Sequence, residues 1–283
     1  MTIKTIKNYS LNFNPKKRIF KQIKFIIYHY TGMKKESQAI ERLTKIQSEV
    51  SSHYLIKNNG TIITLVPDLY EAWHAGKSSW KNYKSLNKNS IGIEVSNPGH
   101  LFSYKKFSDK QINSLIKLSK FLIKKYNISF KNILGHSDIA PQRKKDPGEK
   151  FPWKYLSKNK IGLWHTLKIK ELTKNRNLKI DKIEKELFFN NLYKNKIGLW
   201  HILKQEVLIK NRGSKTSKIE KKFFFNNLFK IGYSKKIPKG LSKNGYLKDL
   251  TKAFQRRFRQ ELINGKIDQE CLFISKNLIK RFN

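Results

Sequence analysis

The sequence predicts an α/β fold, with a mixed central sheet flanked by helices, followed by a small all-α domain. Two observations support this prediction. Short runs of β-branched and aromatic residues alternate with amphipathic helical patterns up to about residue 165, whereas the last segment shows helical periodicity only. A Lys-rich stretch with an internal repeat separates the two parts. We therefore expect one domain at 1–165, a connector at 166–215 and a helical domain at 216–283.

The first half of the expected sheet comes from three segments. Residues 24–30 (KFIIYHY) form a short apolar run that is typical of a buried strand. Residues 37–46 carry apolar side chains at helical spacing. Residues 51–67 predict two strands joined around the turn Asn58-Asn59-Gly60.

The second half begins with residues 90–96 (SIGIEVS). Alternation along this strand places Glu94 on the side opposite Ile93 and Val95. Residues 108–126 predict an amphipathic helix with Ser108 as its N-cap. A short strand at 132–135 then leads into the polar stretch GHSDIAPQRKKDPGEKFPW.

A repeat of 36 residues follows, in which residues 159–194 are echoed by residues 195–230 with 24 of 36 positions identical. Two copies are too few for a solenoid, which needs at least about three. We interpret the repeat as a local duplication. Its two Trp-His pairs, Trp164-His165 and Trp200-His201, are interpreted as packing residues or as passengers of the duplication, in preference to a ligand site.

The segment after the repeat predicts two amphipathic helices around the turn Asn264-Gly265. Four apolar residues share one helical face: Ala253, Phe254, Phe258 and Leu262. A small helical domain follows from this pattern.

The composition gives bounds on function. The net charge is +41, with 52 Lys and nine Arg, while 38% hydrophobic residues suffice for a core. The excess of Lys fits either a compositional bias towards AT-rich codons or a polyanionic partner, and the scarcity of Arg argues against specific nucleic-acid reading. The single cysteine, Cys271, excludes an intrachain disulfide. No apolar signal region or spanning segment is visible, so we expect a cytoplasmic protein, with the periplasm or cell envelope as the alternative. We also expect a monomer.

Three residues are candidates for a metal site. His29 lies in an otherwise apolar strand, where a neutral imidazole needs a polar partner or a metal. His136 follows the end of a strand, and Asp146 is held by Pro147 and Gly148. Two imidazoles and one carboxylate can bind Zn²⁺ and leave a fourth position for water. The simpler alternative is a charged polar loop.

Three further residues lie near this set. Glu94 is either an ordinary outward carboxylate or a general base. Lys144 is either one more surface lysine or an ammonium that stabilises an oxyanion. Asp138 is interpreted as a helix or loop cap, or as a carboxylate that orients an imidazole.

Five stretches together resemble the zinc-dependent N-acetylmuramoyl-L-alanine amidase family (amidase type 2), whose fold is shared with peptidoglycan recognition proteins. They occur in the family's order across most of residues 10–165: IIYHYTGM (26–33), VSSHYLIKNNGTI (50–62), LVPDLYEAWHAGKSSW (65–80), NSIGIEVSNPGH (89–100) and GHSDIAPQRKKDPGEKFPW (135–153). The resemblance implies a zinc groove on one side of a mixed sheet. It also implies cleavage of the amide between N-acetylmuramic acid and L-alanine in peptidoglycan or muropeptides.

Carried over residue by residue, the resemblance implies one zinc ion on His29, His136 and Asp146. Glu94 is then the acid/base residue and Lys144 the oxyanion stabiliser. Trp73, His74 and Asn97 are expected to contact substrate, and His53 to be structural. A non-catalytic peptidoglycan-binding protein on the same fold is the main alternative.

The C-terminal residues resemble a three-helix peptidoglycan-binding module, through IGY at 231–233 and the stretch at 250–270. The duplicated connector departs from the family's usual arrangement. It leaves the relative placement of the two domains open, without affecting the chemistry.

Overall fold

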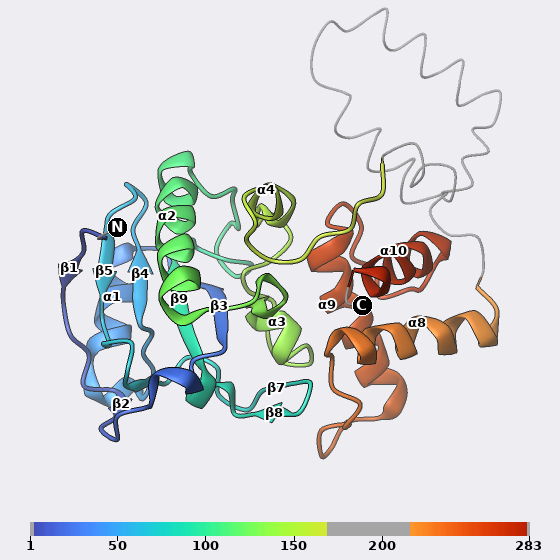
Figure 1. Cartoon of the computed structure of the whole chain (residues 1–283), viewed down its shortest axis with the longest axis horizontal. Coiled ribbons are helices and arrows are strands. Elements are labelled where there is room, and N and C mark those ends of the chain that lie inside the picture. The colour runs from blue at the N-terminus through green and yellow to red at the C-terminus, as the bar shows by residue number, and fades with distance from the viewer. Residues whose placement is uncertain (1–2, 169–215, 282–283) are drawn as a thin grey trace, which may run out of the picture.

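The computed structural model describes residues 3–168 and 216–281, and its centre is a six-stranded mixed sheet. The strand order is β1-β5-β4-β9-β3-β10, in which only the β4–β5 pair is antiparallel. Figure 1 labels the first five of these strands. The predicted mixed α/β architecture is confirmed. The strands are β1 (Ile6–Lys7), β3 (Phe25–Tyr30), β4 (Tyr54–Ile56), β5 (Ile62–Thr64), β9 (Ser90–Val95) and β10 (Ile133–Gly135).

Two short antiparallel pairs and several one-turn helices complete this part of the chain. The pairs are β2 (Phe13–Asn14) with β6 (Glu71–Ala72), and β7 (Ser79–Trp80) with β8 (Tyr83–Lys84). The 3₁₀ turns are η1 (Phe20–Gln22), η2 (Ile46–Ser48), η3 (Leu86–Asn89) and η4 (Phe130–Asn132).

Different helices pack on the two faces of the sheet. Helix α2 (Asp109–Tyr126) packs on one face, where its Ser119 hydroxyl lies 2.7 Å from the hydroxyl of Tyr28. Helix α1 (Glu36–Thr44) packs on the other face, against Leu55 and Ile63. On this face α1 packs against β4 and β5.

Local signals explain where these helices begin and end. Ser108 caps α2 by accepting a hydrogen bond from the Gln111 amide at 3.2 Å, as predicted. Helix α2 ends at Tyr126, and its C-cap Asn127 adopts the left-handed conformation with φ 51°. Two short helices follow β10, namely α3 (His136–Ile139) and α4 (Trp153–Lys158).

Three helices form the C-terminal part, α8 (Lys218–Ile231), α9 (Lys243–Phe258) and α10 (Gln269–Lys280). One expectation here is wrong, because α9 ends at Phe258 and Leu262 lies in the following loop. The buried guanidinium of Arg259 pairs with Asp268, which draws the chain away from the helix. The division into domains at 165 and 216 stays a prediction.

The C-terminal helices contact the α/β part, and α3 lies between the sheet and α9 (Figure 1). Tyr233 donates a hydrogen bond of 2.8 Å to Asp138, and Arg257 pairs with the same carboxylate. The guanidinium of Arg257 also stacks on Trp153, with its Cζ 4.0 Å from the ring centroid.

The repeat is only partly within the described residues. Trp164 and His165 of the first copy are buried and stack with ring centroids 4.9 Å apart, which confirms them as packing residues. Trp200 and His201 lie outside the described residues. The end of the second copy forms α8, which buries Phe224 and Leu228.

Candidate metal centre and active site

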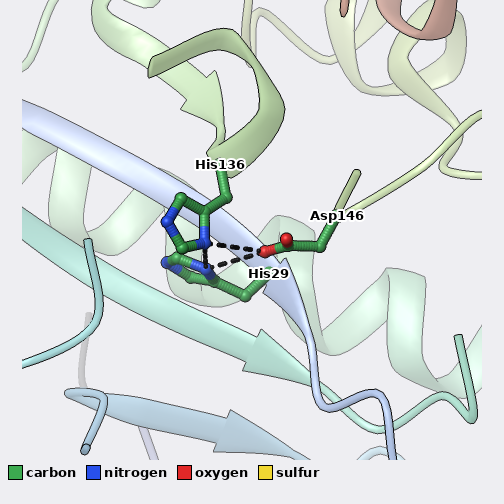
Figure 2. Close-up of side chains that lie close together, drawn as sticks. All are labelled: His29, His136 and Asp146. Atoms are coloured by element: carbon green, nitrogen blue, oxygen red, sulfur yellow. Dashed lines mark hydrogen bonds and ion pairs between the residues drawn. The ribbon is translucent and has the colours of Figure 1, made fainter. Parts of the chain in front are cut away.

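The three predicted ligands meet at one point (Figure 2). His29 Nδ1 lies 2.9 Å from His136 Nδ1 and 3.0 Å from Asp146 Oδ2, and the last two atoms are 3.0 Å apart. Their ligating atoms form the three-residue group in the described chain that could hold a metal ion. The convergence that the prediction requires is therefore present, while zinc binding itself stays a proposal.

Strand pairing brings the two histidines together. Gly135, at the end of β10, is the register partner of Tyr28 in β3. His136 therefore follows directly beside His29. Asp146 reaches the same point because the chain turns back after α3, where its carbonyl accepts a hydrogen bond of 2.9 Å from the Ser137 amide. The ten residues from His136 to Asp146 thus form a closed loop that brings the two side chains together.

The electrostatics of this set suit a divalent cation. Burial, reinforced by His136, lowers the pKa of His29 to about 4, so this imidazole is neutral near pH 7. Burial acts to raise the pKa of Asp146, but His136 and His29 hold that pKa well below its ordinary value. Two imidazole nitrogens and an ionised carboxylate, all buried, are a donor set that zinc accepts in catalytic sites.

A cavity of about 550 Å³ opens beside the ligands. It is lined by the three ligands, by Glu94 and Lys144, and by residues of α1 and of the segment around Trp73. This volume lies within the usual range for a small-molecule site, about 300–1,000 Å³. The two predicted catalytic side chains therefore share one cavity with the predicted ligands.

Glu94 has an unusual environment for a carboxyl group. It is the register partner of His29 on the neighbouring strand, so both side chains leave the same face of the sheet. Its Oε2 is buried and has no hydrogen-bond partner within residues 3–168 and 216–281. Burial and, secondarily, the charge of Asp146 raise the pKa of Glu94 to about 8, while Lys144 opposes the shift. Such a group can both accept and release a proton near neutral pH.

The residues expected to contact substrate differ in their placement. Trp73 is 36% exposed and lines the cavity. His74 also borders the cavity, but both of its ring nitrogens are engaged by His29 and Ser90. Asn97 is not among the lining residues; its amide donates to the Lys105 carbonyl and its oxygen accepts from the Gly99 amide. We carry only Trp73 forward as a substrate contact.

Two other residues, His53 and Asp138, are expected to have structural roles near the site. His53 is fully buried, where its Nδ1 accepts a hydrogen bond of 2.9 Å from the Gly92 amide, and the structure assigns it a structural position. Asp138 accepts a hydrogen bond of 2.8 Å from the Gly135 amide and thereby acts as the predicted cap. It does not reach an imidazole, because Tyr233 and Arg257 occupy its other contacts.

Sequence reasoning missed a group at the rim of the cavity. His100 Nδ1 lies 2.9 Å from the Tyr30 hydroxyl, and its Nε2 lies 3.0 Å from a Glu149 oxygen. His100 also lines the cavity. The only available signal was its position at the end of the stretch NSIGIEVSNPGH.

The mixed sheet carries a buried set of two histidines and an aspartate, with a protonatable carboxyl group in the same cavity. Metal-dependent hydrolases use side chains of these kinds in their catalytic sites. Residues 19–149 match the family described as N-acetylmuramoyl-L-alanine amidase. AmiD of Escherichia coli is 41% identical over 157 residues, which cover 51% of this chain and 56% of AmiD. The 1,6-anhydro-N-acetylmuramyl-L-alanine amidase AmpD of Citrobacter freundii is 40% identical over 104 residues, which cover 37% of this chain and 54% of AmpD.

Solved structures agree over more of the chain. The complex of E. coli AmiD with its substrate anhydro-N-acetylmuramic acid-L-Ala-D-gamma-Glu-L-Lys aligns with a TM-score of 0.70 and 29% identity, covering 95% of this chain and 93% of that one. AMPDH3 from Pseudomonas aeruginosa, in complex with anhydromuramic pentapeptide, aligns with a TM-score of 0.69 and 27% identity. This alignment covers 95% of this chain and 94% of AMPDH3.

The similarity to the N-acetylmuramoyl-L-alanine amidase family thus lies in residues 19–149. The chain spans about half the length of the curated relatives it matches. In the part of the chain that the structure describes, no helix has the length and apolar character needed to cross a bilayer.

Proposed function

We propose that this protein is a zinc-dependent amidase that hydrolyses the bond between N-acetylmuramic acid and L-alanine in muropeptides or peptidoglycan. The observation that carries the proposal is the meeting of His29, His136 and Asp146 within 3.0 Å, beside Glu94 in one cavity. The family match, and the anhydromuramic peptides bound in the AmiD and AMPDH3 complexes, support the same reaction.

When bound to the three ligands, zinc would polarise the scissile carbonyl and make a water molecule at its open position more acidic. Glu94 accepts a proton from the attacking water on its carboxylate, and then delivers that proton to the amide nitrogen as the carbon–nitrogen bond breaks. The raised pKa of Glu94, about 8, suits both transfers near neutral pH. The free amine of L-alanine leaves, and the muramic acid retains a carboxylate.

Lys144 has the complementary task in this proposal. It lines the cavity and lies two residues before Asp146. The backbone amide of Lys144 donates a hydrogen bond of 3.0 Å to the carbonyl oxygen of Ala140, which fixes this loop. Its ammonium group would offset the negative charge that develops on the carbonyl oxygen. Because the backbone at Lys144 is fixed, its ammonium group stays close to the cavity in which the carbonyl would bind.

Substrate binding would use the remaining walls of the cavity. Arg42 and Lys145 line it together with Lys144, so carboxylates of a peptide stem would meet cations there. The exposed ring of Trp73 offers an apolar surface for a sugar or an apolar side chain. The resemblance of the C-terminal residues to a peptidoglycan-binding module stays a prediction.

The test is digestion of two substrates by the zinc-loaded protein, purified sacculi and soluble anhydro-muropeptides, with the products identified by mass. We expect about one zinc per chain and release of intact peptide stems that begin with L-alanine. A protein that takes up no zinc and cleaves neither substrate, yet sediments with sacculi, would be the non-catalytic binder. Light scattering and cell fractionation test the predicted monomer and the predicted compartment.

A further inference from the structure

The nitrogen of His29 that faces away from the metal centre begins a chain of buried hydrogen bonds. Its Nε2 lies 3.0 Å from Nδ1 of His74. Nε2 of His74 lies 3.1 Å from the hydroxyl oxygen of Ser90, which lies 2.5 Å from the carbonyl oxygen of Leu86. His29, His74 and Ser90 are 1%, 8% and 0% exposed, so bulk water cannot readily replace these partners.

The last member of this chain fixes its direction. A backbone carbonyl can only accept, so Ser90 donates its hydroxyl proton to Leu86. The Ser90 oxygen is then free to accept from His74, which places the proton of His74 on Nε2. The neutral His74 ring therefore presents a lone pair at Nδ1, and His29 donates to it from Nε2. The remaining lone pair of His29 is left on Nδ1, the atom that faces His136 and Asp146.

We propose that His74 and Ser90 are positioning residues that hold His29 in the one tautomer and ring orientation that can bind zinc through Nδ1. This inference rests on the proposed zinc centre, and it replaces the expected contact of His74 with substrate. The geometry leaves His74 no free nitrogen with which to bind a ligand.

The surroundings of His74 are built to hold its ring. The oxygen of the Asn87 side chain accepts hydrogen bonds from the backbone amides of His74 and Ala75, at 3.2 and 2.6 Å. The ring packs over Gly92 in the centre of β9, where an added Cβ would lie 2.5 Å from Cγ of His74. A glycine weakens a strand, and here its lack of a side chain makes the space that the imidazole fills.

The same segment contacts the second histidine. Nε2 of His136 lies 3.3 Å from the carbonyl oxygen of Ala75 and 3.3 Å from a guanidinium nitrogen of Arg143, which can only donate. These two contacts do not select one tautomer of His136, whereas the chain that begins at His29 ends in a carbonyl acceptor, which fixes its direction.

The experiment compares two matched pairs of variants by their zinc dissociation constants, measured in competition with a chromophoric chelator at one pH. His74→Leu removes the acceptor for His29, whereas His74→Asn is of similar size and keeps an oxygen near the position of Nδ1. Ser90→Ala removes the acceptor for His74, whereas Ser90→Thr keeps a hydroxyl. Loss of such an orienting partner commonly weakens metal binding about 10–100-fold.

We expect His74→Leu and Ser90→Ala to bind zinc at least about tenfold more weakly than His74→Asn and Ser90→Thr. Equal zinc affinities within each pair would overturn the inference. They would show that the side chains at positions 74 and 90 fill space, and that their hydrogen-bond acceptors do not matter for zinc binding. A wild-type protein that takes up no zinc would instead refute the proposed function.

A second measurement does not depend on any variant. Nitrogen-15 spectra of the histidine rings in the zinc-loaded protein should show His74 and His29 each protonated on Nε2 only. A proton on Nδ1 of His74 would overturn the inference even if the variants bind zinc weakly.

Discussion

His29 and Glu94 are register partners on the parallel strands β3 and β9. Their side chains therefore leave the same face of the sheet at neighbouring positions, and backbone hydrogen bonds fix their relation. One is the proposed ligand from the strand, and the other is the proposed acid/base group. The sheet itself, and not a flexible loop, thus holds the proposed proton-transfer group next to the proposed metal ligand.

Replacing the acid/base group should separate catalysis from metal binding. Glu94→Gln keeps the size of the side chain but cannot transfer the proton, so turnover of the muropeptide should fall about 10²–10⁴-fold. The zinc content should stay unchanged, because Glu94 is not one of the three converging residues. Turnover and zinc per chain are measured on the same sample. Glu41→Gln, on the exposed side of α1, is the control, and near-normal turnover in Glu94→Gln would remove Glu94 from the mechanism.

The stability of the zinc-free protein should depend on pH through the same residue. Burial raises the pKa of Glu94 to about 8 in the folded chain, above the ordinary value of 4.5. Below the ordinary value both states hold the proton and no penalty exists. Between pH 4.5 and 8 the unfolded chain releases its proton first, so folding loses stability as the pH rises.

Glu94→Gln should therefore stabilise the zinc-free protein, and the gain should grow from pH 4.5 towards pH 8 and then level off. The shift of this pKa from 4.5 to about 8 sets an upper limit of about 5 kcal/mol on the gain. Urea unfolding in the presence of a chelator measures the difference at each pH. A gain that does not change with pH would contradict the assigned environment of Glu94.

Removal of the cavity ammonium should reduce turnover. Lys144→Ala should lower kcat about 10²–10³-fold, because the charge that develops on the carbonyl oxygen loses a stabilising partner. Zinc binding should remain. Lys120→Ala, on the exposed surface of α2, removes the same charge far from the cavity and should leave kcat unchanged. Equal effects of the two substitutions would show that Lys144 acts only through the overall charge.

Zinc should stabilise the fold only when its carboxylate ligand is present. At a free concentration of about 100 times its dissociation constant, zinc should stabilise the wild-type protein by about 2.7 kcal/mol. Asp146→Ala should show no such gain and no hydrolysis, because two imidazoles alone hold the ion weakly. Unfolding with and without zinc tests this, and an equal gain in both proteins would place the ion elsewhere.

The contact between the C-terminal helices and the site should be energetically large. Arg257 pairs with Asp138, which lies two residues after His136, and both side chains are buried. Arg257→Met leaves an unpaired buried carboxylate and should destabilise the protein by about 3–5 kcal/mol. Adding Asp138→Asn should cost less than the sum of the single changes, because the two residues form one interaction.

Tyr233→Phe provides the matched control for this contact. It removes a neutral hydrogen-bond donor from the same carboxylate and should cost only about 1 kcal/mol. Denaturant unfolding measures all four variants. A simple sum for the double variant would show that the pair is not coupled.

Much of the fold follows from local patterns in the sequence. The apolar run of β3 and the alternation in β9 identify buried strands, and the serine before α2 marks the start of that helix. The end of α9 does not follow in this way. There the buried contact between Arg259 and Asp268 outweighs a helical pattern that continues to Leu262.

The sequence by itself determined which residue types and motifs are present, and hence the alternation of strands and helices and the candidates His29, His136, Asp146, Glu94 and Lys144. Only the tertiary structure decided that His74 faces His29 and Ser90, that Asn97 is occupied by backbone partners, and that Asp138 connects to the C-terminal helices. The physical reason is that periodicity and capping act over a few residues. Hydrogen-bond direction and burial instead depend on strand register and on packing between segments that lie far apart along the chain.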